Sequence, residues 1–277
     1  MIEIGRFNTL KILKQTSSGL SLGDKSGEEV LLPDKYCPES FKIKDKLEVF
    51  VYRDNEGQKI ATNLTPKLHL HEFALLQVTA ITDVGAFLDW GMGKDLFVPF
   101  KEQKQRMKKG RWYIVYLDLD TKTERLYASS RIEKHLSNDQ LTIKEKQEVS
   151  LLVVRKTDLG YTVIVNNRHN GILYNNEIFR ELDIGEKLNG FVKKIREDNK
   201  IDISLQASGY KNVIDKNIEM IYRALVENKG FLEFTDKSSP NEIYLKFGMS
   251  KKAFKKTIGA LLKQKKITIE PNGIKLI

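Results

Sequence analysis

Three segments of the chain follow one plan, and this internal repeat constrains the fold more than any other feature of the sequence. In each segment a glycine is followed, at one constant separation, by a proline or a tyrosine: Gly19 and Pro33, Gly85 and Pro99, Gly160 and Tyr174. An aspartate or glycine comes next at nearly constant spacing, and a last apolar stretch then starts at Ile60, Leu126 and Ile201. Three matching series of spacings indicate three copies of one small domain.

Each copy is predicted to be a β-barrel. Short runs of β-branched and alternating apolar residues are separated by turn residues, and five such runs fit into each copy. A unit of roughly 65 to 75 residues with five strands suits a closed or nearly closed barrel, which hides its strand edges. The glycine at the start of each second strand fits a sharply coiled barrel strand.

The C-terminal segment has a different pattern. Apolar residues at helical spacing predict a helix over 213–229, and a short strand follows at 231–234. The Ser239-Pro240 pair starts a second helix, and Ser250 caps a third. Two final strands flank a turn at 271–273. Helix, strand, helix, helix and hairpin is the order of a winged helix-turn-helix domain, so we expect a mainly β chain with a C-terminal α+β domain.

The positive charge is concentrated in that C-terminal segment. The chain has a net charge of +10, and residues 211–277 hold 14 Lys and Arg against 7 Asp and Glu. Lys251, Lys252, Lys255 and Lys256 form one basic stripe on the third helix. A stripe of this kind favours contact with the phosphates of a nucleic acid, and the alternative is a solvated lysine-rich face. The absence of arginine there favours phosphate contact over base reading.

The repeats resemble the ribosomal S1-type RNA-binding domain, a form of the oligonucleotide-binding OB fold, and the whole chain resembles the bacterial virulence factor B family. The resemblance is carried by five segments: Lys94 to Pro99, Thr157 to Tyr161, Lys200 to Gln206, Asp236 to Pro240 and Ser250 to Lys256. It implies three tandem S1-like barrels and a winged helix, with domains at 1–66, 67–140, 141–209 and 210–277. It also implies single-stranded RNA binding and control of the expression of other genes.

The S1 resemblance also implies where bases would stack. One aromatic ring is expected after the Gly-Ala of the second strand, where Phe87 stands in the second repeat, while Ser21 and Thr162 replace it elsewhere. A second ring is expected at a fixed interval beyond the first, where the third repeat has Tyr174 and the others have proline. Phe87 and Tyr174 are therefore the stacking candidates, with packing against neighbouring side chains as the alternative. No repeat has both rings, so each barrel alone is predicted to bind weakly.

Basic residues near Tyr174 extend this candidate site. Arg168 and His169 lie near a loop of the third repeat, and Lys193, Lys194 and Arg196 precede its last hairpin. On a strand, Lys194 and Arg196 would point to one face and Lys193 to the other. Phosphate contact beside Tyr174 and a solvated face both remain open.

Other features exclude several classes of function. The single cysteine, Cys37, allows no intrachain disulfide, and no apolar run suits a signal peptide or a membrane helix, so a cytoplasmic protein is expected. His69 and His71 are interpreted as linker residues rather than a metal pair, because no further ligand is near in sequence. No catalytic or phosphate-loop motif occurs. We expect no enzyme activity, no cofactor and no small-molecule substrate.

The leading hypothesis is a regulator that binds single-stranded RNA across the second and third barrels and the winged helix. A DNA-binding transcription regulator is the alternative, weakened by the lack of base-reading residues on the third helix. A ribonuclease is a third hypothesis, for which the binding domains leave no catalytic segment.

Overall fold

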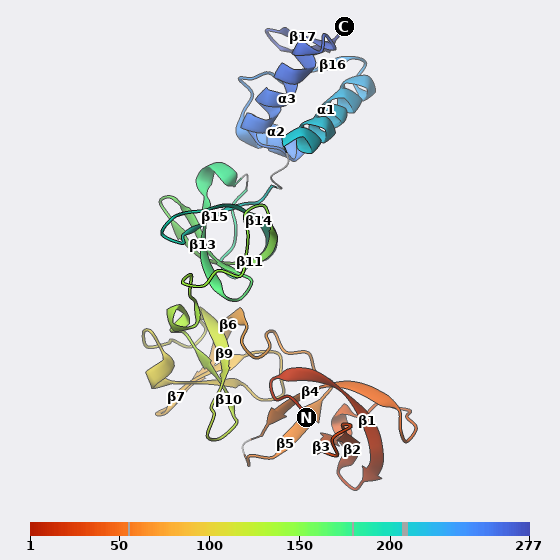
Figure 1. The fold of residues 1–277 in the computed structure, drawn as a ribbon, viewed down its shortest axis with the longest axis vertical. Coiled ribbons are helices and arrows are strands. Elements are labelled where there is room, and N and C mark those ends of the chain that lie inside the picture. The colour runs from red at the N-terminus through yellow and green to blue at the C-terminus, as the bar shows by residue number, and fades with distance from the viewer. Residues whose placement is uncertain (55, 179, 207–209) are drawn as a thin grey trace. The chain divides into compact units, whose positions relative to one another are not determined.

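The computed structural model describes residues 1–54, 56–178, 180–206 and 210–277, with the backbone alone over 210–215. It confirms the predicted fold class, because three five-stranded β assemblies are followed by a winged-helix domain (Figure 1). Residue 209, the predicted end of the third domain, lies outside the described residues. None of the helices in the described part of the chain is long and apolar enough to cross a membrane.

The first and third assemblies are closed barrels with the same strand order. The strands of the first, in the order β1-β2-β3-β5-β4, are β1 (Arg6–Thr16), β2 (Gly19–Gly23), β3 (Glu29–Pro33), β4 (Lys46–Arg53) and β5 (Lys59–Thr62). Those of the third are β11 (Glu148–Thr157), β12 (Gly160–Val165), β13 (His169–Tyr174), β14 (Lys187–Ile195) and β15 (Ile201–Ser204). In both barrels the third and fifth strands pair in parallel and close the sheet.

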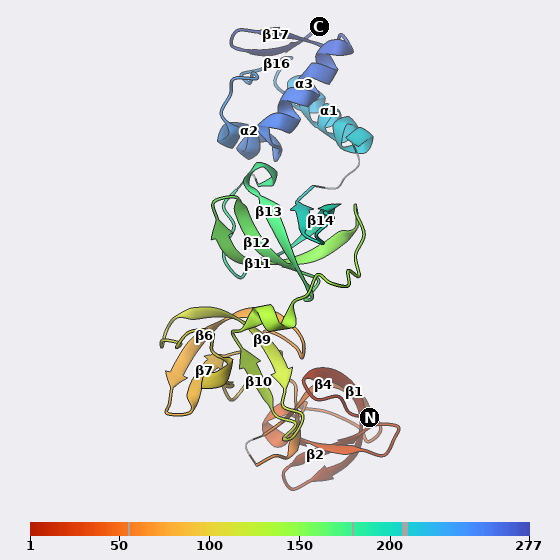
Figure 2. The same ribbon diagram turned by 60° about the vertical axis from the view of Figure 1, so that its left-hand side comes forward.

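The second assembly is a five-stranded sheet that curls in the same way (Figure 2). Its strands are β6 (Phe73–Ile81), β7 (Gly85–Asp89), β8 (Leu96–Pro99), β9 (Trp112–Leu119) and β10 (Leu126–Ser129), in the order β10-β9-β6-β7-β8. The end strands β8 and β10 lie against each other. This is the nearly closed form of the predicted barrel.

The repeated glycines stand where two neighbouring strands approach each other closely. Gly19, Gly85 and Gly160 are the first residues of β2, β7 and β12. A Cβ atom on any of the three would lie within 2.3 Å of a carbonyl oxygen in the next strand. The close approach of the backbones therefore requires glycine at these positions.

The first two barrels share part of their core and belong to one compact unit. Phe50, from β4 of the first barrel, is fully buried in the core of the second, with its ring 6.0 Å from that of Trp90. The Leu70 amide donates a hydrogen bond of 2.9 Å to the Gly5 carbonyl. Apolar burial thus fixes the end of β4 against the second barrel.

The C-terminal domain has the predicted order of elements. Its helices are α1 (Tyr210–Glu227), α2 (Pro240–Phe247) and α3 (Lys251–Lys263), and its sheet joins β16 (Phe231–Leu232), β18 (Gly273–Leu276) and β17 (Ile267–Glu270). Ser239 forms a capping box with Glu242 at the start of α2, and the Ser250 hydroxyl accepts a hydrogen bond from the Ala253 amide at the start of α3. Phe254 of α3 is fully buried in the domain core.

A half-buried histidine makes the stability of the second barrel depend on pH. His135, in the 3-10 helix η3 (Ile132–His135), stacks on Tyr116 with ring centroids 3.9 Å apart. Its Nε2 atom is buried and has no hydrogen-bond partner among the described residues. Burial lowers the pKa of His135 below its ordinary value of 6.5. The unfolded chain therefore binds this proton more readily than the folded chain, and stability falls as the pH drops below 6.5.

We expect urea to unfold the second barrel more easily at about pH 5 than at about pH 7.5, with His135 contributing to the difference. In a His135→Phe variant the ring stack is kept and the proton site is removed, so the pH dependence becomes flatter. Urea titrations of both proteins at the two pH values measure this. Equal pH dependence in the two proteins would remove His135 from the explanation.

Candidate nucleic-acid interface

Two phenylalanine rings lie side by side on the outer face of the second barrel. Side chains alternate along β7 and β8, so that Phe87, Phe97 and Pro99 face outward while Ala86 and Val98 are buried. Phe87 and Phe97 are directly paired across the two strands, with ring centroids 5.3 Å apart. Both rings are half-buried, which leaves part of each available for stacking.

This pair corrects one inference from the sequence. Each barrel was predicted to have at most one ring on its face, because Pro99 stands where the resemblance implies the second aromatic. Phe97 lies two residues before Pro99 and supplies the second ring from a different position. The second barrel therefore has a two-ring platform.

The two rings form part of the wall of a groove of about 530 Å³. The groove lies over the face of β7 and β8 and extends to the turn before β7, at Val84, and to the β9–β10 loop, at Thr123 and Arg125. The second and third strands with these two loops are the surface that OB folds use for oligonucleotides. A volume between about 300 and 1,000 Å³ is typical of ligand sites.

Charged groups surround these rings. Lys94 and Lys101 line the groove, and neither side chain forms a salt bridge within the described part of the chain. Of the acidic groups, Asp95 accepts a hydrogen bond of 2.7 Å from the Thr79 hydroxyl, and Asp120 accepts hydrogen bonds from its own loop. Those local hydrogen bonds hold the pKa of Asp120 below its ordinary value. The groove thus combines rings with available cations, as single-stranded nucleic acid requires.

The third barrel brings three of the predicted residues together on its outer face. The Tyr174 hydroxyl accepts a hydrogen bond of 2.5 Å from Arg196, whose guanidinium also contacts Asp202 at 3.0 Å. Lys194 is paired with Asp202 across β14 and β15, so Lys194 and Arg196 share a face as predicted. Tyr174 is half-buried, and Arg196 lies 5.8 Å from its ring centroid. The face offers one ring and two cations.

The structure changes the roles predicted for the neighbouring residues. His169 is fully buried, and its Nδ1 atom lies 2.7 Å from the Ser137 carbonyl oxygen, so the prediction that it contacts RNA is wrong. A position at the first residue of β13, inside the barrel, explains the burial. Lys193 is exposed but forms a salt bridge of 2.6 Å with Glu177, which reduces its charge toward a ligand. Arg168 is exposed in the turn between β12 and β13.

The matching face of the first barrel has no ring at the two equivalent positions and carries a carboxylate paired with a lysine. Ser21 and Leu31 are paired there, at the positions of Phe87 and Phe97. The Ser21 hydroxyl donates to Glu29 at 2.6 Å, and this hydrogen bond and Lys14 hold the pKa of Glu29 below its ordinary value. The face therefore carries an ion pair between Glu29 and Lys14 at neutral pH, and it offers no ring at the positions of Phe87 and Phe97.

The basic stripe of α3 is partly engaged within the winged-helix domain. Lys255 forms a salt bridge of 3.5 Å with Asp236, and the Lys251 ammonium donates to the Lys237 carbonyl at 3.3 Å. Lys252 and Lys256 are exposed on the same helix.

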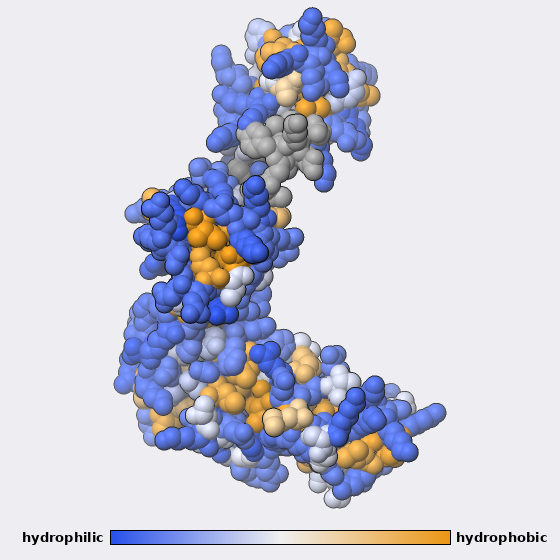
Figure 3. All heavy atoms as spheres, viewed as in Figure 1, coloured by the Kyte–Doolittle hydropathy of each residue, from blue (hydrophilic) through white to orange (hydrophobic). Residues whose placement is uncertain are grey.

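In the space-filling view, hydrophobic surface is confined to separate patches among hydrophilic residues (Figure 3).

Two family models match separate parts of this chain. Residues 4–64 match the model of the S1 domain, and residues 219–276 match that of the CvfB-like winged helix domain. The protein YitL of Bacillus subtilis is 29% identical, over 97% of this chain and 92% of its own. Conserved virulence factor B of Staphylococcus epidermidis is 26% identical, over 99% of this chain and 94% of its own. A crystal structure of a multidomain protein with nucleic acid binding domains, from Streptococcus pneumoniae, covers 99% of this chain at 24% identity and a TM-score of 0.40.

The barrels and the C-terminal domain define a multidomain protein of S1-type barrels and a winged helix. Over nearly its full length the chain is similar to YitL and to Conserved virulence factor B, and its C-terminal domain matches the CvfB-like winged helix.

Of the residues that line the groove, sequence reasoning named only Phe87 as a binding candidate, and it missed the cations Lys94 and Lys101. Phe97 could have been found, since it stands close to Pro99 and alternates with buried Leu96 and Val98. Tyr52 and Arg53 were also missed, and they come from the first barrel. No local sequence pattern predicts that these two residues line the groove, because their position depends on how β4 packs against the second barrel.

Proposed function

We propose that this protein binds single-stranded RNA and thereby controls the expression of other genes. The RNA contacts the two-ring face of the second barrel, the Tyr174 face of the third barrel and the lysines of α3. We place it in the cytoplasm, acting by binding alone and without catalysis. The proposal rests chiefly on the paired rings of Phe87 and Phe97 above a groove lined by cations.

The chemistry of the face favours a single strand. In a duplex the base faces are stacked on one another, so only an unpaired base can cover a protein ring. Each base stacked on an aromatic ring contributes about 1–3 kcal/mol, and every base has a face that can stack. Several weak sites on one chain also increase the total affinity through effective concentration. The expected ligand is an unstructured strand with little sequence preference.

Titration of the full-length protein with fluorescent oligonucleotides tests the proposal. We expect binding of unstructured RNA that is micromolar or tighter and weakens steeply with salt. Single-stranded DNA and duplex DNA of the same sequence serve as competitors. Absence of saturable RNA binding at low salt would refute the function, and preference for duplex DNA would favour a DNA-binding regulator that uses the winged helix.

Replacing Lys252, Lys255 and Lys256 by glutamine is expected to weaken RNA binding and reduce its salt dependence. Each lost phosphate contact lowers the slope of log K against log salt by about 0.7 for a single strand, so the slope should fall by up to about 2. The matched control replaces Lys42, Lys44 and Lys46, exposed lysines of the first barrel, by glutamine. Equal slopes for the two triple variants would show that α3 acts only through net charge.

A further inference from the structure

Part of the first barrel lines the groove of the second. Tyr52 and Arg53, at the end of β4, and Asp54 in the following turn line the groove that contains Phe87 and Phe97. The first barrel has no ring at the equivalent positions of its own face. The residues that the first barrel adds to the groove therefore belong to its β4–β5 hairpin. They do not come from β2 and β3, which are equivalent to the strands that carry the rings in the second barrel.

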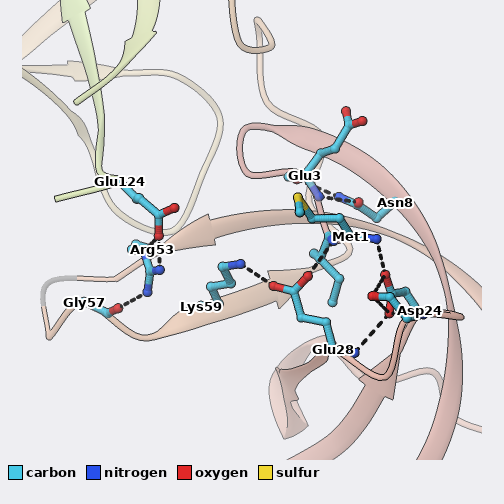
Figure 4. Close-up of polar contacts among 11 residues, drawn as sticks. Met1, Glu3, Asn8, Asp24, Glu28, Arg53, Gly57, Lys59 and Glu124 are labelled. Atoms are coloured by element: carbon cyan, nitrogen blue, oxygen red, sulfur yellow. Dashed lines mark hydrogen bonds and ion pairs between the residues drawn. The ribbon is translucent and has the colours of Figure 1, made fainter. Parts of the chain in front are cut away.

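Contacts between the barrels hold that hairpin in place. The Arg53 guanidinium donates to the Gly57 carbonyl at 2.5 Å within its own hairpin and to the Glu124 carboxylate of the β9–β10 loop, with an Nε–Oε2 distance of 3.0 Å (Figure 4). The hydrogen bond from Arg53 lowers the pKa of Glu124, so the pair is charged at neutral pH. The two hairpins are thereby joined beside the groove.

The shared core fixes the strand that leads to the hairpin. Phe50, two residues before Tyr52, is fully buried against Trp90, and Tyr52 is half-buried against the same core. Groove residues that are anchored in a packed core lose little conformational entropy when a ligand binds. The described hydrogen bonds of Arg53 use three of its five N–H donors, which leaves donors for a phosphate oxygen.

We propose that the second barrel and the β4–β5 hairpin of the first form one composite site, in which single-stranded RNA lies between Phe87 and Phe97 on one side and Tyr52 and Arg53 on the other. The inference rests on the proposed function and specifies which residues of the first barrel contact the same RNA. The Tyr52 ring contacts a base, and Arg53 contacts a phosphate while it keeps its salt bridge to Glu124. The first barrel thus acts as a wall of its neighbour's site.

RNA titrations with two variants of the full-length protein test this. Tyr52→Leu keeps an apolar side chain against the core and removes the ring, so we expect an affinity at least about 5-fold lower. Arg53→Gln is expected to reduce the salt slope by about 0.7. Lys14→Gln is the matched control, since Lys14 is a cation of the same barrel that is paired with Glu29 and lies outside the groove.

The outcomes separate this inference from the proposed function. Wild-type affinity and salt slope in both hairpin variants, together with weaker binding when Phe87 and Phe97 are replaced, would overturn the composite site and leave the function intact. No RNA binding by the wild-type protein would overturn both. Ultraviolet crosslinking to oligouridine uses the wild-type protein, so its result does not depend on whether a variant folds correctly. Crosslinks in the tryptic peptide that ends at Arg53 would support the composite site, and crosslinks confined to other peptides would contradict it.

Discussion

Replacing Phe87 and Phe97 together by leucine is expected to reduce the affinity for unstructured RNA by about 30-fold or more. The two rings supply the stacking surface of the second barrel, and the loss of even about 1 kcal/mol per ring gives a change of about this size. Because both rings are half-buried on the outer face, leucine preserves the apolar cover over the buried strands. Fluorescence anisotropy with a short RNA measures the change.

A matched variant of the first barrel makes this result specific. Leu31 occupies the place of Phe97 on a face without rings, so Leu31→Ala is expected to leave RNA affinity unchanged. The thermal unfolding of both variants should stay close to that of the wild type. If the double leucine variant bound RNA as tightly as the wild type, the second barrel would have no part in binding.

Replacing Phe50 by alanine is expected to destabilise the first two barrels by about 3–5 kcal/mol, which is the usual cost of removing a fully buried phenylalanine. Its ring packs 5.7 Å from that of Phe7 in the first barrel and 6.0 Å from that of Trp90 in the second. The cavity would thus lie where the two barrels meet, and the fixed position of the β4–β5 hairpin would be lost with it.

Tryptophan fluorescence during urea unfolding measures this effect selectively. The chain has two tryptophans, Trp90 and Trp112, and both belong to the second barrel. Phe254→Ala is the matched control, because it removes an equally buried phenylalanine from the winged helix. We expect Phe50→Ala to lower the midpoint of the tryptophan transition and Phe254→Ala to leave it unchanged. A shift of equal size in both variants would show that the domains unfold as one.

The fold could be predicted because its signals are local and repeated. The glycine that opens each second strand, the spacing to the fifth strand and the caps at Ser239 and Ser250 each follow from a few neighbouring residues. The structure confirms the barrels and the winged helix that these signals predicted. His169 was misjudged because a polar residue beside a loop usually faces solvent, whereas this one begins a barrel strand.

The site could be predicted only in part. Phe87 and Tyr174 were placed by their distance from a glycine, and both lie on outer faces. Phe97 was missed because the resemblance assigned the second stacking position to Pro99, two residues later. The Arg53–Glu124 contact joins residues 71 positions apart, and nothing in either segment alone indicates it.

The alternation of side chains along the second and third strands has a consequence for how these barrels diverge. Inward residues such as Leu22, Leu88 and Val163 stay aliphatic, while the outward place holds Ser21, Phe87 or Thr162. A substitution at the outward place alters the ligand surface and spares the interior. One scaffold, copied three times along a chain, can therefore differ module by module: the second copy has two rings on its outer face, and the β4–β5 hairpin of the first lines the groove beside them.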